Sequence, residues 1–337
     1  EILIGLVGSE MCIRDRYKHI IDGLEMDQVI RDHEYSMVSR HLHETYELYY
    51  LAEGQRYYFI ERQTYLVKAG DVVLIKPNLI HKTSIAGESY HNRILLQIDR
   101  AFMDGVLKAC GLENMETVYG QDAEILHIPE EKQPVILELF ASMEREMAQK
   151  QKGWLTAVKL QLARLLLEIT RCPQITEQPM QNGTWNRIGT GHGENWIEGR
   201  TLAQEEQKKD SGASARLEKG RASTIWKHQK VNQVADYLGR HPETSESLEE
   251  LAKRFYISKS YLSRIFREVT SFTVNEYKNV SRIKKSQQLL LHSDCSITEV
   301  SDLLGFENLT YYERVFKKYT GVTPLKYRKE NGYSRSF

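Results

Sequence analysis

Residues 264–277 read RIFREVTSFTVNEY, and residues 314–327 read RVFKKYTGVTPLKY. Five of these fourteen positions are identical, and both copies distribute basic and apolar residues with the period of an amphipathic helix. The C-terminal third of the chain is therefore a duplicated unit. Each copy is preceded by a short apolar segment that predicts another helix. Two such pairs are typical of tandem helix-turn-helix units, which place two helices in DNA.

The charge of the chain is distributed unevenly. Its 337 residues, enough for about two domains, include 46 Lys plus Arg and 46 Asp plus Glu, so the formal net charge is zero. Residues 226–337 contain 19 Lys plus Arg against 13 Asp plus Glu, which leaves the remainder with 27 against 33. A basic C-terminal part and an acidic remainder are typical of a DNA-binding module joined to a domain with another function.

The cysteines and the apolar segments limit the classes of protein further. The four cysteines lie far apart and form no C-x-x-C pair, so they indicate neither a zinc site nor a disulfide framework and favour a reducing cytoplasm. No apolar run approaches the roughly 18 residues of a membrane span, so we expect no membrane association.

Residues 9–16 read SEMCIRDR, which resembles a translated sequencing adaptor. We therefore predict that residues 1–16 are non-native and exclude them from the fold.

The N-terminal half has the pattern of a β domain. Stretches rich in β-branched and aromatic residues predict strands at residues 46–51, 57–60, 65–67, 72–75 and 94–98. Turn residues such as Gly54 and Gly70 separate them. Several short strands at close spacing favour a small barrel or jelly roll. We assign this barrel to residues 17–130.

A helical period replaces the strand pattern after the barrel. Two helices separated by Gly153 are predicted within residues 131–172, where they cover one side of the barrel, form a dimer contact, or do both. The next residues, 173–224, are polar and predict a flexible linker. The C-terminal domain is assigned to residues 225–330, followed by a tail at residues 331–337.

The first copy of the duplicated unit begins with a capped helix. Ser247 is placed to cap it, and Glu250 completes the arrangement of a capping box. Ser258 caps the following helix, which buries one face and leaves the other free. The candidate DNA-contacting residues of this copy are Lys259, Ser260, Tyr261, Ser263, Arg264 and Arg267.

In the second copy Gly305 makes the turn and Asn308 caps the equivalent helix. Residues 274–291 are predicted to form one continuous helix between the copies, a stiff spacer for two helices that enter grooves about 34 Å apart. Lys and Arg suit phosphates, while Arg, Ser, Thr and Glu near a helix start suit base edges. The candidate DNA-contacting residues of this copy are Asn308, Leu309, Thr310, Tyr311, Glu313, Arg314, Lys317 and Lys318.

Residues 282–324 contain RIKKSQQLLL, SITEVSDLLGF and YYERVFKKYTGVTP. With these motifs, residues 226–330 resemble the DNA-binding domain of the AraC/XylS family of bacterial transcription regulators. The resemblance implies a dimer whose cupin-type domain binds a small molecule, often a carbohydrate, and which contacts RNA polymerase at a promoter. The resemblance implies base-facing roles for Ser260, Ser263, Arg264, Leu309, Thr310, Glu313 and Arg314.

Four positions depart from the family pattern. Tyr256 and Ser271 stand at turn positions where the second copy has glycine. Ser286 and Ser301 stand where the family usually has a small apolar residue. We expect the missing left-handed glycines and the buried hydroxyl groups to cost stability without removing a DNA-contacting residue.

Residues 41–54 have the spacing H-x-H-x3-E-x6-G, which resembles the first cupin motif, and residues 70–81 resemble a loosened second one. In metal-bearing cupins such side chains ligate a divalent ion. The leading glycine of the first motif is absent, so ligand contact, metal binding and structural hydrogen bonding all remain open. Tyrosines in the same strands suit a polyhydroxy ligand as well as ordinary packing. We assign ligand contact to His41, His43, Glu47, Tyr49 and His81 and predict no metal ion and no other cofactor.

Taken together, the chain is predicted to be an α+β multidomain protein, with a cupin-like barrel, a helical pair and an all-α tandem helix-turn-helix domain. We interpret it as a ligand-responsive regulator of carbohydrate uptake or catabolism genes, not an enzyme. Its expected partners are promoter DNA, RNA polymerase, a small-molecule effector such as a sugar, and a second copy of itself. A metal-dependent cupin enzyme with a regulatory DNA-binding domain, a constitutive DNA-binding protein and an interaction scaffold remain alternatives.

Overall fold

The computed structural model describes residues 13–32, 43–109, 111, 123–172, 174–181, 184–190, 195–200 and 211–331. The chain folds as two compact units, the first made of residues 1–60 and 64–221 and the second of residues 61–63 and 222–337. The first unit is an antiparallel β domain with helices on one face of its sheet, and the second is helical. Among the described residues, none of the helices is long and apolar enough to span a bilayer.

The first unit is built on antiparallel strands in the order β1-β2-β7-β3-β5-β8, with β4 and β6 also paired to β3. Strand β3 is long enough to change partners, because its first part pairs with β5 and β7 while its last part pairs with β6. The register of β3 shifts between Leu51 and Glu53. The strands are β1 (Ile13–Ile21), β2 (Leu24–Arg31), β3 (Tyr46–Ile60), β4 (Gln63–Lys68), β5 (Asp71–Ile75), β6 (His81–Ile85), β7 (His91–Ile98) and β8 (Ala123–His127).

Gly54 allows the backbone of β3 to pass close to its neighbour. Its φ is 86°, and a Cβ atom there would lie 2.4 Å from the carbonyl oxygen of Tyr90. A side chain at this position would therefore clash with backbone as well as strain the φ angle. This close passage lets one strand take part in both β ladders.

The alternation of side chains along β3 separates two apolar clusters. Leu48 and Tyr50 belong to the cluster that includes the helices, whereas Tyr49 and Leu51 belong to the cluster on the other face. Because successive strand residues point to opposite faces, Glu47 shares its face with Tyr49 and Leu51. This face carries the polar cluster described below.

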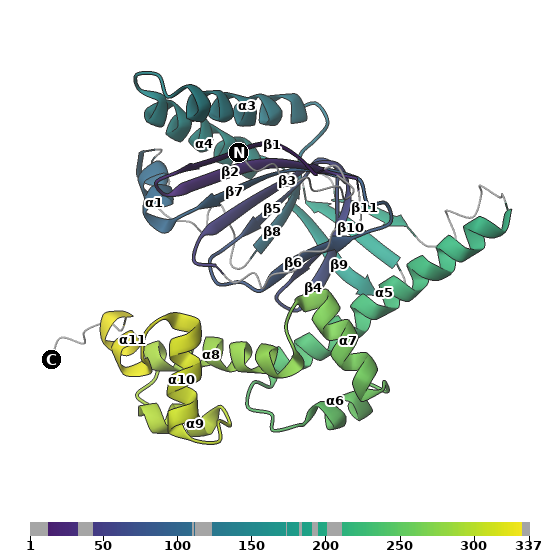
Figure 1. Ribbon diagram of the computed structural model, residues 1–337, viewed down its shortest axis with the longest axis vertical. Helices are drawn as coiled ribbons and strands as arrows, with labels where there is room; N and C mark the ends of the chain where they lie inside the picture. The colour runs from purple at the N-terminus through teal and green to yellow at the C-terminus, as the bar shows by residue number, and fades with distance from the viewer. Residues whose placement is uncertain are drawn as a thin grey trace, which may run out of the picture. The chain divides into compact units, whose positions relative to one another are not determined.

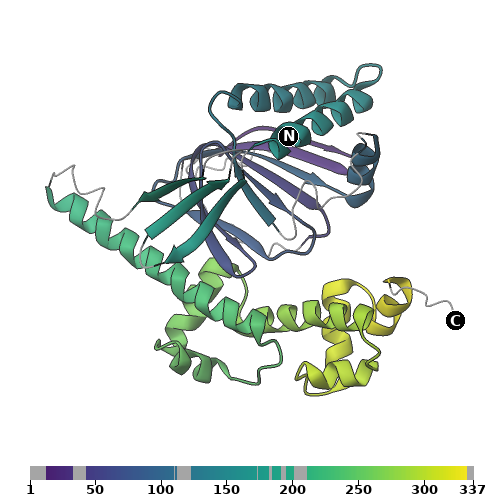
Figure 2. The same cartoon turned by 180° about the vertical axis from the view of Figure 1, so that it is seen from behind.

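Three helices cover the face of the sheet that Leu48 and Tyr50 share (Figures 1 and 2). They are α1 (Arg100–Ala109), α3 (Gln133–Gln149) and α4 (Trp154–Thr170). Tyr50 stacks against Phe140 of α3 with ring centroids 5.7 Å apart. Each fully buried side chain of this layer stabilises the fold by about 1.5–3 kcal/mol. The two helices predicted on either side of Gly153 are thus confirmed.

The start of the described chain differs from the expectation. Strand β1 begins at Ile13 and pairs with β2 from Ile13 opposite Arg31 to Ile21 opposite Leu24. Residues 13–16, which we predicted to be non-native and outside the fold, therefore belong to an edge strand. Backbone hydrogen bonds form a β ladder with little regard to side-chain identity, and the sequence motif did not reveal this pairing. Residues 1–12 lie outside the described residues.

The predicted flexible linker also differs from the structure. Within residues 173–224 lie β9 (Gln174–Gln181), β10 (Thr184–Thr190), β11 (Asn195–Arg200) and the first part of α5 (Ser211–Arg240). Strands β9, β10 and β11 pair antiparallel, and the register places Ile188 opposite Ile197. Composition alone missed this ladder, because the register between strands is set only when the chain reverses direction.

The second unit is helical throughout its elements. Helix α8 joins the pair α6–α7 to the pair α9–α10, so the duplicated sequence is a duplicated helix-turn-helix (Figures 1 and 2). The spacer helix predicted at residues 274–291 is confirmed with one further residue. Besides α5, the helices are α6 (Leu248–Arg254), α7 (Lys259–Thr270), α8 (Val274–His292), α9 (Ile297–Leu303), α10 (Leu309–Thr320) and α11 (Pro324–Asn331).

The helix starts carry the caps expected from the sequence. Ser247 and Glu250 form a capping box at α6, and Ser296 and Glu299 form the equivalent box at α9. Each box satisfies two backbone N–H groups that have no partner within their helix. The duplication therefore extends to the hydrogen bonds that start the first helix of each pair.

The departures from the glycine pattern have the predicted backbone consequence. Tyr256 and Ser271 have φ angles of 57° and 64°, close to the 68° and 76° of the equivalent Gly305 and Gly321. A non-glycine residue in this left-handed region costs roughly 1–2 kcal/mol. The first copy is therefore more strained than the second at both turns.

The two buried serine hydroxyl groups differ in their hydrogen bonding. Ser286 and Ser301 are both fully buried. The Ser286 hydroxyl lies 2.6 Å from the hydroxyl of Tyr312. The Ser301 hydroxyl finds no hydrogen-bond partner among the described residues. The stability cost that we expected from a buried hydroxyl thus falls on Ser301.

Replacing Ser301 with alanine should raise the free energy of unfolding by about 1–2 kcal/mol, because the change removes a buried hydroxyl without a partner. Ser286→Ala is the matched control and should lower it by about 1–3 kcal/mol, since it leaves the Tyr312 hydroxyl buried without this partner. Urea denaturation followed by circular dichroism measures both values. Equal destabilisation by the two changes would contradict this assignment.

Candidate functional site

Helix α7 presents the residues predicted from the first copy on its outer surface. Its inner face buries Leu262, Ile265, Phe266 and Val269. Ser258 accepts the backbone N–H of Tyr261 and so caps the helix as predicted. The predicted DNA-contacting residues of α7 are all exposed except Tyr261, which is half-buried: Lys259, Ser260, Tyr261, Ser263, Arg264 and Arg267.

Helix α10 repeats this arrangement. It buries Tyr312, Val315 and Phe316, and Asn308 accepts the backbone N–H of Tyr311 at 2.8 Å. Because both helices start on such a cap, the geometry of their first turns is fixed. The predicted residues of this copy are all exposed except the half-buried Tyr311: Asn308, Leu309, Thr310, Tyr311, Glu313, Arg314, Lys317 and Lys318.

Each of these two helices holds an arginine over a tyrosine one turn earlier. The Arg264 guanidinium lies 5.0 Å from the Tyr261 ring centroid, and the Arg314 guanidinium lies 5.3 Å from that of Tyr311. A cation held over an aromatic ring is attracted by the negative face of the ring, which restricts its rotamers. The two arginines are thus pre-oriented on the exposed surface. The sequence analysis named all four residues as candidates but did not predict these two contacts.

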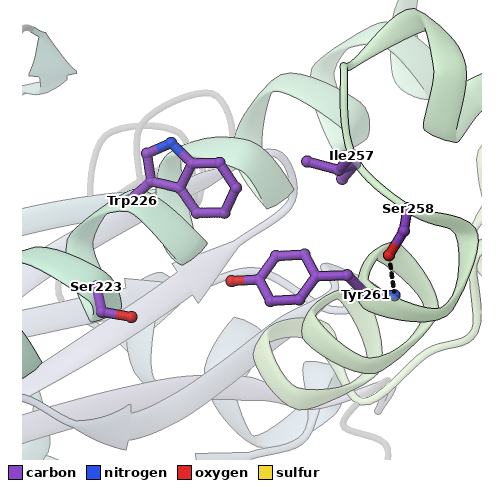
Figure 3. Close-up of a pocket in the computed structure, with 5 residues that line it drawn as sticks. All are labelled: Ser223, Trp226, Ile257, Ser258 and Tyr261. Carbon is purple, nitrogen blue, oxygen red and sulfur yellow. Dashed lines mark hydrogen bonds between the residues drawn. The ribbon is translucent and has the colours of Figure 1, made fainter.

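A pocket of about 520 Å³ opens at the start of α7, lined by Ser223, Trp226, Ile257, Ser258 and Tyr261 (Figure 3). The Trp226 and Tyr261 rings lie 5.7 Å apart, and the Lys230 ammonium lies 5.8 Å from the Trp226 ring. Trp226 is 42% exposed. Sequence reasoning did not select Trp226, because only the packing of α5 beside α7 brings it to this surface.

Arg282 of α8 joins the two helix-turn-helix pairs. Its Nε donates to the carbonyl of Pro242 at 2.8 Å and its Nη2 donates to the carbonyl of Thr244 at 2.9 Å. The same guanidinium lies 5.2 Å from the Phe306 ring of the second pair. Burial lowers the pKa of Arg282 from its usual value, although an arginine remains charged in proteins. This buried cation ties the loop before α6 to the turn before α10.

Gly305 makes that contact possible. A Cβ atom at this position would lie 2.6 Å from the carbonyl oxygen of Glu243 and 3.2 Å from Nη2 of Arg282. A side chain here would push the loop of the first pair away from the turn of the second. Lys278 of α8 adds a hydrogen bond to the carbonyl of Glu246 at 3.2 Å. The spacer helix is therefore fixed to both pairs by polar contacts as well as by apolar packing.

The first unit contains a second group of predicted residues. Glu47 on β3 is fully buried, and its Oε2 lies 3.1 Å from Nε2 of His43 and 3.3 Å from Nε2 of His81. Tyr58 donates its hydroxyl to Oε1 of Glu47 at 2.5 Å. We call His43, Glu47, Tyr58 and His81 the barrel cluster. His41, also predicted for ligand contact, lies outside the described residues.

The charge state of the barrel cluster follows from its neighbours. Burial raises the pKa of the Glu47 carboxyl, but the His81 and His43 imidazoles outweigh burial and hold this pKa below its usual range. Burial and the Glu47 carboxylate raise the pKa of Tyr58 well above its usual value, so its hydroxyl remains a donor. Tyr49 packs edge-on against Tyr58 at 5.3 Å and so borders the cluster.

Comparisons with known proteins assign both units to described families. Residues 29–166 match the AraC-like ligand binding domain, and residues 251–330 match a helix-turn-helix domain. The "Msm operon regulatory protein" of Streptococcus mutans is 38% identical over 100 residues, which are 30% of this chain and 36% of that protein. The "HTH-type transcriptional activator RhaR" of Cronobacter sakazakii is 34% identical over 95 residues, 28% of this chain and 34% of that protein.

These relatives align with part of their length only. The chain spans about a third of the length of the curated relatives it matches. Among solved structures, the C-terminal domain of AraT, a response regulator from Geobacillus stearothermophilus, is 27% identical with a TM-score of 0.31 and covers 32% of this chain and 90% of that chain.

Replacing Arg282 with methionine should lower the free energy of unfolding of the second unit by about 3 kcal/mol, because two buried carbonyl groups lose a charged donor. Lys285→Met, an exposed cation on the same helix, is the matched control and should change stability by less than about 0.5 kcal/mol. Urea denaturation measures both. A similar stability for the two variants would show that Arg282 does not join the pairs.

Proposed function

Because the chain belongs to the AraC family of transcription regulators, we propose that it is a ligand-responsive regulator that binds promoter DNA through α7 and α10. The observation that carries this proposal is the repeated surface of the two helices. Both start on a side-chain cap, bury the same apolar face and hold an arginine over a tyrosine. We call α7 and α10 the recognition helices.

The roles of the exposed residues follow from their positions on the recognition helices. Arg264 and Arg314 lie in the second turn, where a guanidinium can donate two hydrogen bonds to the O6 and N7 atoms of guanine. Lys317 and Lys318 lie in the last turn of α10, where an ammonium suits a phosphate group. Arg282 and Gly305 hold the two helices in one arrangement, so both can engage one duplex without a large ordering cost.

The effector belongs to the first unit in this proposal. A buried carboxylate, two imidazoles and several tyrosines near the barrel cluster offer hydrogen bonds to a small polar molecule, and a sugar is the class that we favour. An effector can act only if it binds one state of the regulator more tightly than another. We further propose that this state controls contact with RNA polymerase, and that the chain has no catalytic activity.

The helices of the first unit also leave apolar surface for a second copy of the chain. Leu160 and Leu167 of α4 are 64% and 38% exposed and lie seven residues apart on one helix face. Apolar side chains in such a row suit a symmetric dimer contact, which would bring two second units to neighbouring DNA sites.

Replacing Arg264 or Arg314 with alanine should weaken binding to a selected DNA site by about 1–3 kcal/mol and relax the base preference where each arginine binds. Lys317→Ala should instead weaken binding to all sequences alike and lower the salt dependence. Fluorescence anisotropy over a series of salt concentrations measures these effects.

Lys329→Ala serves as the matched control, because Lys329 is an exposed cation on α11 rather than on a recognition helix. Its affinity should stay within about twofold of the wild type. Unchanged affinity in the Arg264→Ala and Arg314→Ala variants would remove the support for base contact by the recognition helices.

Leu160→Glu should shift the chain from dimer to monomer, because it places a charge in the proposed apolar contact. Light scattering coupled to size-exclusion chromatography measures the mass. Glu138→Leu is the matched control, because it replaces an exposed charged residue of α3 with an apolar one. It should leave the dimer intact. A dimer that persists in Leu160→Glu would place the contact elsewhere.

A further inference from the structure

The barrel cluster brings three possible metal ligands together from separate positions in the sequence. His43 precedes β3, Glu47 lies in β3, and His81 begins β6, which pairs with the far end of β3 through Ile60 opposite His81. One ring nitrogen of His43, one of His81 and a carboxylate oxygen of Glu47 all lie within 4.8 Å of one another. The curvature of β3 is therefore what closes this group.

Both imidazole rings are oriented by backbone carbonyl groups. Nδ1 of His43 lies 3.0 Å from the carbonyl oxygen of Thr45, and Nδ1 of His81 lies 2.8 Å from that of Leu79. A carbonyl oxygen only accepts, so Nδ1 of His81 carries the proton in its hydrogen bond, whereas Nδ1 of His43 also lies 2.9 Å from the Thr45 hydroxyl. Histidines that bind metals through Nε2 are commonly held by a hydrogen bond from the other ring nitrogen in this way.

The same orientation turns both Nε2 atoms toward one oxygen of Glu47. The two rings meet edge to face with centroids 4.9 Å apart, and His81 is 1% exposed. The two imidazoles and the carboxylate therefore face one another in a buried place.

A metal ion at this point would accept a lone pair from each Nε2 and one from the carboxylate oxygen. Bonds of about 2.0–2.2 Å place neighbouring ligand atoms about 3.0–3.4 Å apart. The separations from Oε2 of Glu47 are 3.1 Å to His43 and 3.3 Å to His81. Both separations from Glu47 fit such an ion, and the three ligand atoms lie within 4.8 Å of one another.

Tyr58 supports the carboxylate from the opposite side. Its hydroxyl donates to Oε1 of Glu47 at 2.5 Å, which leaves Oε2 for the two imidazoles. Its ring also stacks on His81 with an interplanar angle of 24°. Hydrogen bonds of this kind fix the orientation of a ligating carboxylate.

We propose that His43, Glu47 and His81 bind one divalent transition-metal ion in the first unit. The sequence alone led us to assign these residues to an effector without an ion, and the convergence of two imidazoles and one carboxylate in the fold leads to this different assignment. Two imidazoles and one carboxylate suit ions such as Zn²⁺, Fe²⁺ or Ni²⁺. Three protein ligands leave coordination positions open. If the proposed function holds, oxygen atoms of the effector occupy those positions.

The test uses the full chain without an affinity tag, stripped with a chelator and then titrated with ZnCl₂ by calorimetry. Mass spectrometry of metals after dialysis gives the stoichiometry. The wild type should retain one zinc ion per chain, and zinc should raise its unfolding temperature. His43→Ala and His81→Ala should each lose the retained zinc. Tyr58→Phe should still bind it, about 10–100-fold more weakly.

His127→Ala is the matched control, because His127 is also paired with a carboxylate, that of Asp71 at 2.7 Å, but belongs to no group of three ligands among the described residues. It should bind zinc like the wild type. Circular dichroism of the zinc-free proteins checks that each variant is folded.

A wild type that retains no zinc, iron or nickel would overturn the proposal, and so would full zinc retention in a His43→Ala, His81→Ala double variant. Both measurements are made without DNA. Binding of the same preparations to DNA is measured separately, so a failure of the metal site and a failure of the proposed regulator function give different results.

Discussion

The helical unit depends on the contacts of the buried Arg282 guanidinium. This guanidinium reaches two carbonyl groups of the first helix-turn-helix pair and the Phe306 ring of the second, so one side chain of the spacer helix fixes both. Gly305 permits this approach because the carbonyl of Glu243 fills the space of a side chain. In the proposed function, two recognition helices held in this way read DNA as one body, whereas two freely jointed helices would lose entropy on binding.

Strand β3 has a comparable role in the β domain, because it contributes to both apolar clusters and to both β ladders. Its alternating side chains supply both apolar clusters, and its bend at Gly54 brings the far end of the strand to β6. The buried Glu47 is tolerated because two imidazoles and a tyrosine surround it. Burying polar groups lowers the stability of a fold. Their presence therefore favours a functional role for the barrel cluster over a purely structural one.

The pattern of residues predicted much of the helical unit. Caps at Ser247 and Ser258, the strained turn at Tyr256 and the exposed face of α7 all depend on neighbours within one or two helical turns. Local spacing contains that information. The strands of residues 174–200 escaped prediction because antiparallel pairing depends on chain reversal, and composition does not report reversal.

The sequence by itself determined the duplication, the capped recognition helices and the identity of the imidazole and carboxylate groups in the barrel. Only the tertiary structure decided that Arg282 joins the two pairs, that Trp226 lies beside Tyr261, and that Tyr58 completes the cluster around Glu47. The physical reason is the separation in sequence over which each kind of interaction acts. Helix periodicity and capping act over a few residues, whereas these contacts join residues brought together by packing, as with Arg282 and Pro242, which lie forty positions apart.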